Sequence, residues 1–266
     1  MANWLKNIRG VLLDISGTLH IGEETTRDAI QALKRLRQNG LAVRFITNAT
    51  KESKSGLHAK LTRLGFDINS DEIFTSLTAA RRYVESQKLR PFCLLQDDAK
   101  KDFAGLEVTN PNAVVVGLAP DYFNYESLNQ AFRLLLNNKD CKLIAVHKAR
   151  YYQRTEGLSM GPGPFVEALE YASGKKAIVV GKPQLEFFQS VLEDFNCLAE
   201  ETVMIGDDVN LDVLGALDAN IGGILVKTGK FRDGDEDHLG NKDRCLCLSD
   251  FAAAVDTILA ATGNTT

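Results

Sequence analysis

The chain has 266 residues, of which 44% are hydrophobic and 25% charged, and its formal net charge is −4. These values are typical of a soluble globular protein, and the absence of a basic excess argues against a nucleic-acid partner. Five scattered cysteines, no apolar run near the ~20 residues of a membrane span and no signal-peptide core predict a cytoplasmic chain with no membrane partner.

The first predicted elements alternate between strand and helix. Gly10 to Leu13 is predicted to be a buried strand, because it is apolar on both faces. A helix is predicted over Thr25 to Asn39, and Gly40 is placed to end it. Val43 to Ile46 is the next strand, and a second helix closes at Gly65. This βαβα order predicts an α/β fold with a parallel sheet covered by helices on both faces.

The middle third adds three strand-like runs, at Pro91 to Leu95, Ala113 to Val116 and Leu143 to Val146, and a helix around Tyr125 to Leu136. These elements can extend the first sheet or form an inserted domain. The loop from Gly157 to Pro164 is rich in turn residues and is typical of a hinge that returns the chain to the first sheet.

After this loop the alternation of strand and helix resumes. Ala177 to Val180 is predicted to be a strand, and Pro183 suits the first turn of the helix that follows it. Thr202 to Ile205 and Gly223 to Val226 are two further strands. We therefore expect these last elements to complete the first sheet.

Polar side chains follow four of these strands. In chain order these side chains are Asp14 with Ser16, then Thr47 with Asn48, then Lys182, and last Asp207 with Asp208 and Asp212. Each has an ordinary structural explanation, such as a helix cap, a turn or a solvated charge. Their joint occurrence is more informative, because open α/β sheets bind ligands beyond the carboxyl ends of their strands. Carboxylates suit Mg²⁺, and a lysine and a hydroxyl suit phosphoryl oxygens. The pattern predicts a metal and phosphate site in which a carboxylate can attack phosphorus to form an aspartyl-phosphate.

The same residues resemble the four ordered motifs of the haloacid dehalogenase (HAD) superfamily. In chain order, the motifs are Asp14-Ile-Ser-Gly-Thr18, Thr47-Asn48, Lys182 and Gly206-Asp-Asp-x-x-x-Asp212. The interval from Asn48 to Lys182 resembles the branch with a large α/β cap inserted between the second and third motifs. The resemblance implies a Rossmann-like parallel-sheet core at residues 1–77 and 176–266, with an inserted α/β cap domain at residues 78–175.

The resemblance also implies a Mg²⁺-dependent phosphatase of small phosphorylated substrates. Asp14 would be the nucleophile and a metal ligand, joined at the ion by the backbone carbonyl of Ser16 and by Asp207. Lys182 would assist catalysis, and the substrate-binding residues would be Asp14, Ile15, Ser16, Thr47, Asn48 and Lys182. Asp208 and Asp212 would lie behind them and orient water or Lys182. A homodimer formed through the cap is suggested by the resemblance alone.

Ser16 departs from the superfamily pattern, because most of its phosphatases have a second aspartate there as general acid and base. A serine hydroxyl is a poor proton donor, and losing a general acid costs about 10²–10⁴-fold in rate. One hypothesis is a catalytically weak or inactive module that binds phosphate, metal or another protein. The other is an enzyme for substrates with good leaving groups, such as pyrophosphate, phosphoramidates, and aryl or acyl phosphates.

The enzyme hypothesis is favoured, because the chain resembles phosphatases of such labile substrates that also have Asp-Ile-Ser at this motif. A receiver domain phosphorylated on Asp14 is a third hypothesis, and the motif order and the insertion argue against it. After the strand ending at Val146 lies a basic and aromatic cluster, and its members are His147, Lys148, Arg150, Tyr151, Tyr152 and Arg154. A solvated strand end with packed aromatics is favoured there over a basic rim that meets an anionic leaving group.

Overall fold

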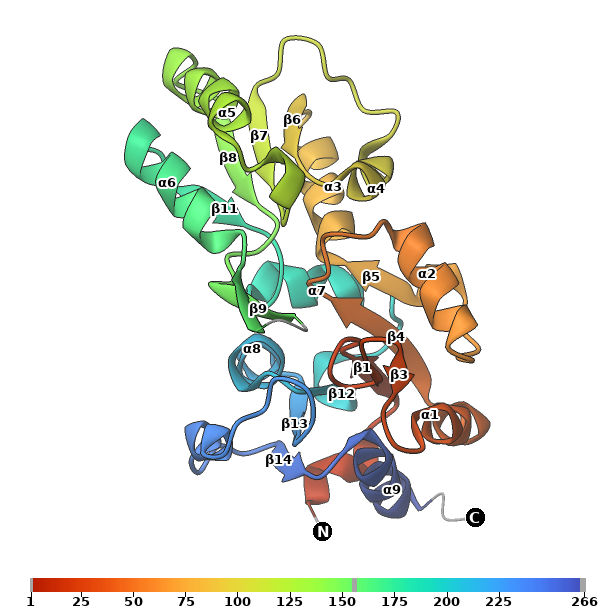
Figure 1. Cartoon of the computed structure of the whole chain (residues 1–266). Helices are drawn as coiled ribbons and strands as arrows, with labels where there is room; N and C mark the ends of the chain where they lie inside the picture. The colour runs from red at the N-terminus through yellow and green to blue at the C-terminus, as the bar shows by residue number, and fades with distance from the viewer. Residues whose placement is uncertain (1, 155–156, 264–266) are drawn as a thin grey trace. The chain divides into compact units, whose positions relative to one another are not determined.

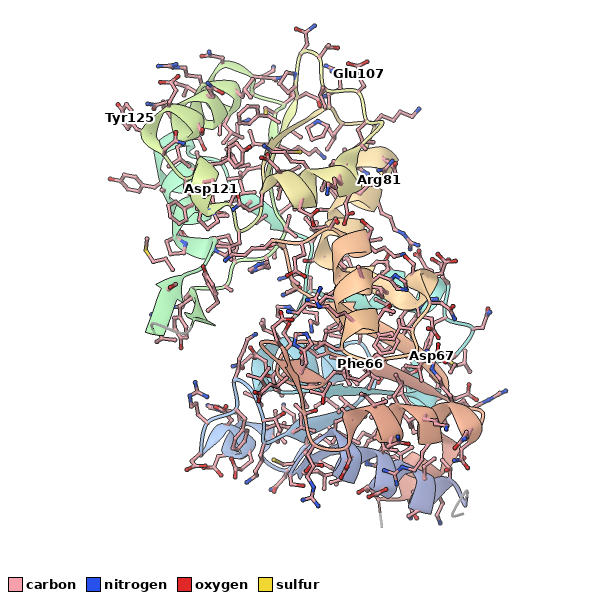
Figure 2. The ribbon with its side chains drawn as sticks, turned by 45° about the vertical axis from the view of Figure 1, so that its right-hand side comes forward. Phe66, Asp67, Arg81, Glu107, Asp121 and Tyr125 are labelled. Carbon is pink, nitrogen blue, oxygen red and sulfur yellow. The ribbon has the colours of Figure 1, made fainter. Side chains whose placement is uncertain are left out.

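The computed structural model describes residues 2–154 and 157–263, which form two compact units. The first unit comprises Met1–Thr47, His58–Phe74 and Lys182–Thr266, and the second comprises Asn48–Leu57 and Thr75–Gly181. Phe66 is buried in the first unit, whereas Tyr125 in the second projects into solvent (Figure 2). The sequence pattern does not predict that residues 48–57 belong to the second unit. The division into a catalytic core and a cap at residues 78 and 175 stays a prediction.

Over the described residues, the first unit is built on a six-stranded sheet in the order β14, β13, β12, β1, β4, β5 (Figure 1). The strands are β1 (Gly10–Leu13), β4 (Ala42–Thr47), β5 (Ile73–Thr75), β12 (Thr202–Gly206), β13 (Gly222–Val226) and β14 (Cys245–Leu248). β1 pairs in parallel with β4 on one side and with β12 on the other. β1, β12 and β13 are buried at every position, which is why their sequences are continuous apolar runs.

The helices of this unit are α1 (Ala29–Gln38), α7 (Leu185–Glu193), α8 (Gly215–Asp218) and α9 (Phe251–Thr262), and α2 (Lys54–Arg63) runs into it from the second unit. α1 packs against α9, and α7 packs against α8 (Figure 1). From β1 the chain moves outward to β4, and from β12 it moves in the opposite direction to β13 and β14. The strand order therefore reverses between β1 and β12, which is the point where such sheets form a ligand-binding crevice.

The second unit has its own sheet over the described residues, four parallel strands in the order β11, β8, β7, β6. Its strands are β6 (Pro91–Leu94), β7 (Ala113–Val116), β8 (Lys142–Ala145) and β11 (Ala177–Val179), and its helices are α3 (Ser76–Ser86), α4 (Asp97–Lys100), α5 (Tyr125–Asn137) and α6 (Gly163–Ser173). Val115 packs with Leu77 of α3 on one face. Val114 packs with Leu135 of α5 and Val166 of α6 on the other. This alternation gives the sheet two separate apolar layers.

Two short hairpins complete the structure, β2 (His20–Ile21) with β3 (Glu24–Thr25), and β9 (Tyr151–Arg154) with β10 (Gly157–Met160). The α/β prediction, with parallel sheets covered by helices and an inserted second unit, is confirmed. In the part of the chain that the structure describes, no helix is both long and apolar enough to cross a membrane.

Two predictions of local structure near chain reversals differ from the structure. The helix predicted from about Thr25 is present, but it begins at Ala29, because Thr25 pairs with His20 in the β2–β3 hairpin. The predicted hinge at Gly157 to Pro164 is instead β10 followed by the start of α6. Its glycines and prolines serve the hairpin and the helix start, where turn residues are equally common.

Two predictions near the return to the first unit are also wrong. Ala177–Val179 pairs with β8 of the second unit rather than with a strand of the first sheet. A short apolar run shows that a strand is buried, but it carries no information about its neighbour. Pro183 does not lie in the first turn of α7, since that helix begins at Leu185 with Gln184 as its N-cap.

Candidate active site

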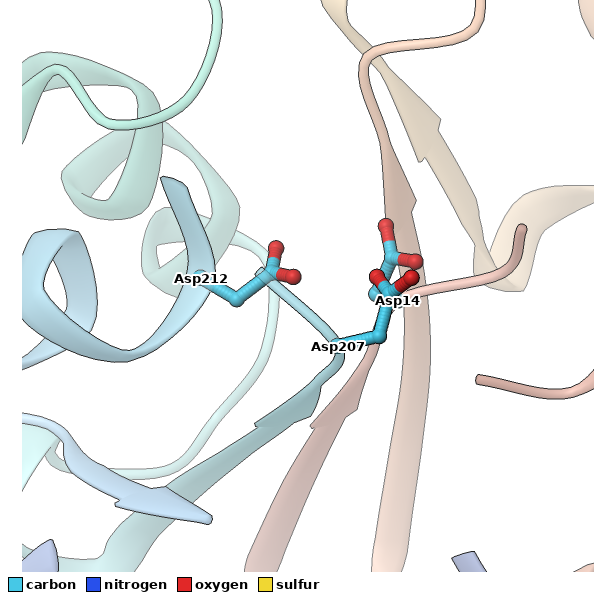
Figure 3. A group of neighbouring side chains, drawn as sticks. All are labelled: Asp14, Asp207 and Asp212. Atoms are coloured by element: carbon cyan, nitrogen blue, oxygen red, sulfur yellow. The ribbon is translucent and has the colours of Figure 1, made fainter. Parts of the chain in front are cut away.

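Two acidic residues lie where the strand order of the first unit reverses. Asp14 directly follows β1, and Asp207 directly follows its neighbour β12. The backbone N–H of Asp14 donates to the carbonyl oxygen of Ile205 at 2.9 Å, which ties the two strand ends together. Figure 3 shows Asp212 pointing toward both from the adjoining turn. One carboxylate oxygen from each of these three buried aspartates lies within 4.8 Å of the others.

The ammonium group of Lys182 lies among these carboxylates. Its Nζ donates to Oδ1 of Asp14 and to Oδ1 of Asp212, each at 2.6 Å. The side chain is 2% exposed. Burial works against its charge, but Asp14 and Asp212 outweigh burial and hold the pKa of Lys182 above its usual value. Lys182 is therefore a fixed cation that holds one oxygen of Asp14.

One π-helical turn, η6 (Val209–Leu214), positions both Asp208 and Asp212. Asp208 is its N-cap and Asp212 lies within it. Oδ1 of Asp208 caps this turn by accepting the backbone N–H groups of Asn210 and Leu211. Oδ2 of Asp212 accepts the backbone N–H of Asp208 at 3.1 Å, so each of its oxygens has a partner. Asp212 thus fixes Lys182, whereas Asp208 fixes the turn. Single π-helical turns occur frequently at functional sites.

Only one of the two carboxylate oxygens of Asp207 accepts a hydrogen bond from the described residues. Its Oδ2 accepts the backbone N–H of Lys230 at 2.6 Å, whereas its buried Oδ1 has no hydrogen-bond partner among the described residues. Burial, and then repulsion by Asp14 and Asp212, raise the pKa of Asp207 well above its usual value. A buried carboxylate oxygen without a donor, beside two more carboxylates, fits the oxygen ligands that a hard divalent cation requires.

The remaining predicted residues lie at or just after the ends of β1 and β4. Ile15 is buried and Ser16 is exposed, and Ser16 forms a backbone bridge with His20. Thr47 is the buried last residue of β4. Asn48 is the first residue of the second unit, and its Oδ1 would lie 2.6 Å from a Cβ at Gly181, the residue before Lys182. The first unit therefore brings together Asp14, Lys182, Asp207, Asp208 and Asp212.

Two family models match the chain, one described as haloacid dehalogenase-like hydrolase at residues 11–109 and one as HAD-hydrolase-like at residues 179–254. Over 252 residues the chain is 56% identical to the haloacid dehalogenase-like hydrolase domain-containing protein 2 of Bos taurus. This match covers 95% of this chain and 96% of that protein. The chain belongs to the haloacid dehalogenase-like hydrolases. The resemblance inferred from the motifs is confirmed.

Two other proteins that this hydrolase is similar to are phosphatases by name. It is 41% identical to the phospholysine phosphohistidine inorganic pyrophosphate phosphatase of Homo sapiens, over 97% of this chain and 98% of that protein. The solved structure of 4-nitrophenylphosphatase from Thermotoga maritima superposes with a TM-score of 0.88 at 26% identity, over 96% and 99% of the two chains. The prediction of a HAD-type phosphatase is confirmed at the level of enzyme class.

A loop that the motifs did not indicate lies against Asp207 of this hydrolase. Thr228, Gly229 and Lys230 follow β13, and a Cβ at Gly229 would lie 2.1 Å from Oδ2 of Asp207. A Cβ at Gly17 would lie 1.9 Å from the same atom. Both glycines have positive φ, +55° and +99°, so the two loops can enclose Asp207 only with glycine there. The signal for this loop in the sequence is the polar run Lys227 to Lys230 after a strand, the same kind of signal as at the other four strand ends.

The basic cluster of the second unit is partly ion-paired. Nζ of Lys148 lies 2.6 Å from Oε1 of Glu167 and 2.9 Å from Oε2 of Glu170. His147 is buried, with Nε2 3.3 Å from the hydroxyl oxygen of Thr50. These contacts favour packing and ion pairing over a basic rim for Lys148 and His147. The side chain of Arg154 lies outside the described part of the chain.

Proposed function

We propose that this hydrolase is a Mg²⁺-dependent phosphohydrolase that forms an aspartyl-phosphate on Asp14. The observation that carries the proposal is the buried carboxylate cluster, in which Oδ1 of Asp207 lacks a donor among the described residues. Asp14, Asp207 and the backbone carbonyl of Ser16 would hold the ion. Once bound, Mg²⁺ would reduce the repulsion between the anionic nucleophile and the phosphoryl oxygens.

The protein groups around Asp14 support its role as nucleophile. Lys182 holds Oδ1 of Asp14, so the other carboxylate oxygen is available to attack phosphorus. Asp212 fixes Lys182 from the opposite side, which orients the ammonium without a contribution from the substrate. The Thr47 hydroxyl, the Lys182 ammonium and Asn48 are the groups we assign to the phosphoryl oxygens. Attack forms an oxygen–phosphorus bond, the leaving group departs with the electron pair, and water then hydrolyses the acyl phosphate.

The preferred substrates follow from Ser16. Its exposed hydroxyl is a poor general acid, so substrates whose leaving groups depart unprotonated are favoured. Pyrophosphate, phosphoramidates and aryl or acyl phosphates have this property. The names of the human phosphatase and of the Thermotoga maritima phosphatase include substrates of this kind. A cytoplasmic location and a homodimer stay predictions, from composition and from family resemblance respectively.

The proposal is tested with pyrophosphate and 4-nitrophenyl phosphate, with and without Mg²⁺. Wild type should show Mg²⁺-dependent turnover that falls at least about 10³-fold in Asp14→Asn. Asp243→Asn, at an exposed aspartate of the first unit, is the matched control and should keep wild-type rates. Binding of metal and phosphate with no turnover above Asp14→Asn would instead support the inactive module that Ser16 allows.

A further inference from the structure

Lys230 is brought to the acidic cluster by a loop that is fastened at two points. The Thr228 hydroxyl donates to the carbonyl oxygen of Gly17 at 2.6 Å. The backbone N–H of Lys230 donates to Oδ2 of Asp207 at 2.6 Å. The first bond reaches the segment after β1, and the second reaches the segment after β12. The backbone at Lys230 is therefore positioned by both strand ends that carry the site.

The two lysines near the cluster differ in what their ammonium groups can still bind. Lys182 is 2% exposed and pairs with Asp14 and Asp212, both at 2.6 Å, so its ammonium can meet only a group bound beside Asp14. The Lys230 side chain is 54% exposed, and its only ion pair within residues 2–154 and 157–263 is with Oδ2 of Asp208 at 3.5 Å. That separation is longer than a hydrogen bond. Lys230 therefore has donors available to a ligand at the edge of the cluster.

Lys230 is the group near the cluster that can meet a second anionic group. In the proposed function, Lys182 and Thr47 bind the phosphoryl oxygens beside Asp14. The exposed Lys230 ammonium lies 3.5 Å from its ion-pair partner Asp208, so it can also meet a group that departs from the cluster. Ser16 is a poor proton donor for such a group.

We propose that the Lys230 ammonium binds the leaving group and makes the site selective for leaving groups that carry their own negative charge, as the second phosphate of pyrophosphate does. This inference rests on the proposed phosphohydrolase function. An oxygen of Asp14 bonds to one phosphorus, the bridging P–O bond breaks, and its electron pair departs with the second phosphate. Water then releases the first phosphate and restores the Asp14 carboxylate. A fixed cation stabilises the charge that grows on the departing oxygen without transferring a proton.

The test compares two substrates in Mg²⁺ buffer, pyrophosphate, which has an anionic leaving group, and phosphoramidate, which releases neutral ammonia. Lys230→Met should lower kcat/KM for pyrophosphate by about 10²-fold. For phosphoramidate the change should stay within about fivefold, the size of an exposed charge effect. Lys230→Arg should recover most of the loss, since it restores the charge. Lys227→Met is the matched control and should change neither rate, because Lys227 pairs with Glu236.

A binding measurement separates this inference from the proposed function. In calorimetric titrations, Lys230→Met should weaken the binding of methylenediphosphonate about tenfold while leaving the binding of inorganic phosphate unchanged. In wild type, added salt should raise the KM for pyrophosphate more than the KM for phosphoramidate, which requires no variant. Equal losses on both substrates, or equal weakening of the binding of both ligands, would overturn the inference. If wild type hydrolyses neither substrate, the proposed function fails, and the two titrations still decide whether Lys230 binds a second phosphate.

Discussion

At the scale of single residues, the proposed function makes Ser16 the residue that selects among substrates. The acid that the superfamily usually has at this position is replaced by an exposed hydroxyl, while Asp14 two residues earlier is buried and held by Lys182. On that proposal the nucleophile is kept in a defined position, but position 16 offers no carboxylic acid to protonate the leaving group. Catalysis should depend on the leaving group rather than on the phosphoryl group, which is common to all substrates.

We therefore expect wild type to hydrolyse pyrophosphate and aryl phosphates far faster than alkyl phosphates such as simple sugar phosphates. Ser16→Asp should raise the rate on alkyl phosphates by up to about 10²-fold, because the new carboxyl can protonate an alkoxide. It should change the rates on pyrophosphate much less. Steady-state kinetics on a series of phenyl and alkyl phosphates measures both effects, and Ser16→Ala is the control. Similar chemistry-limited rates for wild type on alkyl and aryl esters would mean that another residue donates the proton.

At the scale of elements, one glutamate joins α6 to the return strand β11. Oε1 of Glu170 accepts the backbone N–H of Ala177 at 2.7 Å, and its Oε2 lies 2.9 Å from Nζ of Lys148. Burial acts to raise its pKa, but the Ala177 N–H and the Lys148 ammonium outweigh burial and hold the pKa of Glu170 below its usual 4.5. The ionised form is therefore the stabilising one. Its contribution is complete above pH 4.5 and is lost as the pH falls through the folded-state pKa.

Glu170→Gln should lower the free energy of unfolding by about 1–3 kcal/mol at pH 7, because it weakens two charge-assisted hydrogen bonds. The difference from wild type should shrink below pH 4.5, because the unfolded chain then takes up a proton at Glu170 that the folded chain takes up only at lower pH. Urea denaturation at pH 7 and at pH 3.5 measures both values. Glu167→Gln is the matched control, since Glu167 also pairs with Lys148 but is exposed, and its loss should stay below about 1 kcal/mol. A Glu170→Gln deficit that is the same at both pH values would contradict this account.

At the scale of the whole molecule, the acidic cluster should make stability depend on the metal. Asp14, Asp207 and Asp212 are buried within 4.8 Å of one another. Lys182 pairs with Asp14 and Asp212, but both of them still repel the charge of Asp207 when no metal ion is bound. A ligand that binds only the folded state stabilises it by about 2.7 kcal/mol at 100 times its Kd. On the proposed function, Mg²⁺ is such a ligand.

Mg²⁺ should therefore raise the Tm of wild type by several degrees relative to the protein in EDTA. Asp207→Asn should abolish this increase, and in EDTA its Tm should equal or exceed that of wild type because one repelling charge is gone. Calorimetry at fixed pH gives both values, with Asp243→Asn as the control that keeps the wild-type response. An Asp207→Asn variant that still gains the full increase from Mg²⁺ would show that the ion binds elsewhere.

The sequence by itself determined the α/β class, the strands of both sheets that read as apolar runs, and the polar residue that ends each of four strands. It also determined the absence of an acid at position 16. These properties are local, because strand burial, turn chemistry and residue identity can be read within a few neighbouring positions. The HAD motifs are local in the same way, which is why Asp14, Lys182 and Asp207 could be selected before their geometry was known.

Only the tertiary structure decided the properties that depend on segments far apart in the chain. It paired Ala177–Val179 with β8, joined residues 48–57 to the second unit, and gave Lys182 two carboxylate partners. It also left Oδ1 of Asp207 without a donor among the described residues and brought Lys230 to the cluster on a loop more than 200 residues after Asp14. A strand's neighbour, a charge's partner and an atom's access to water are set by packing between distant segments, and no local pattern encodes them.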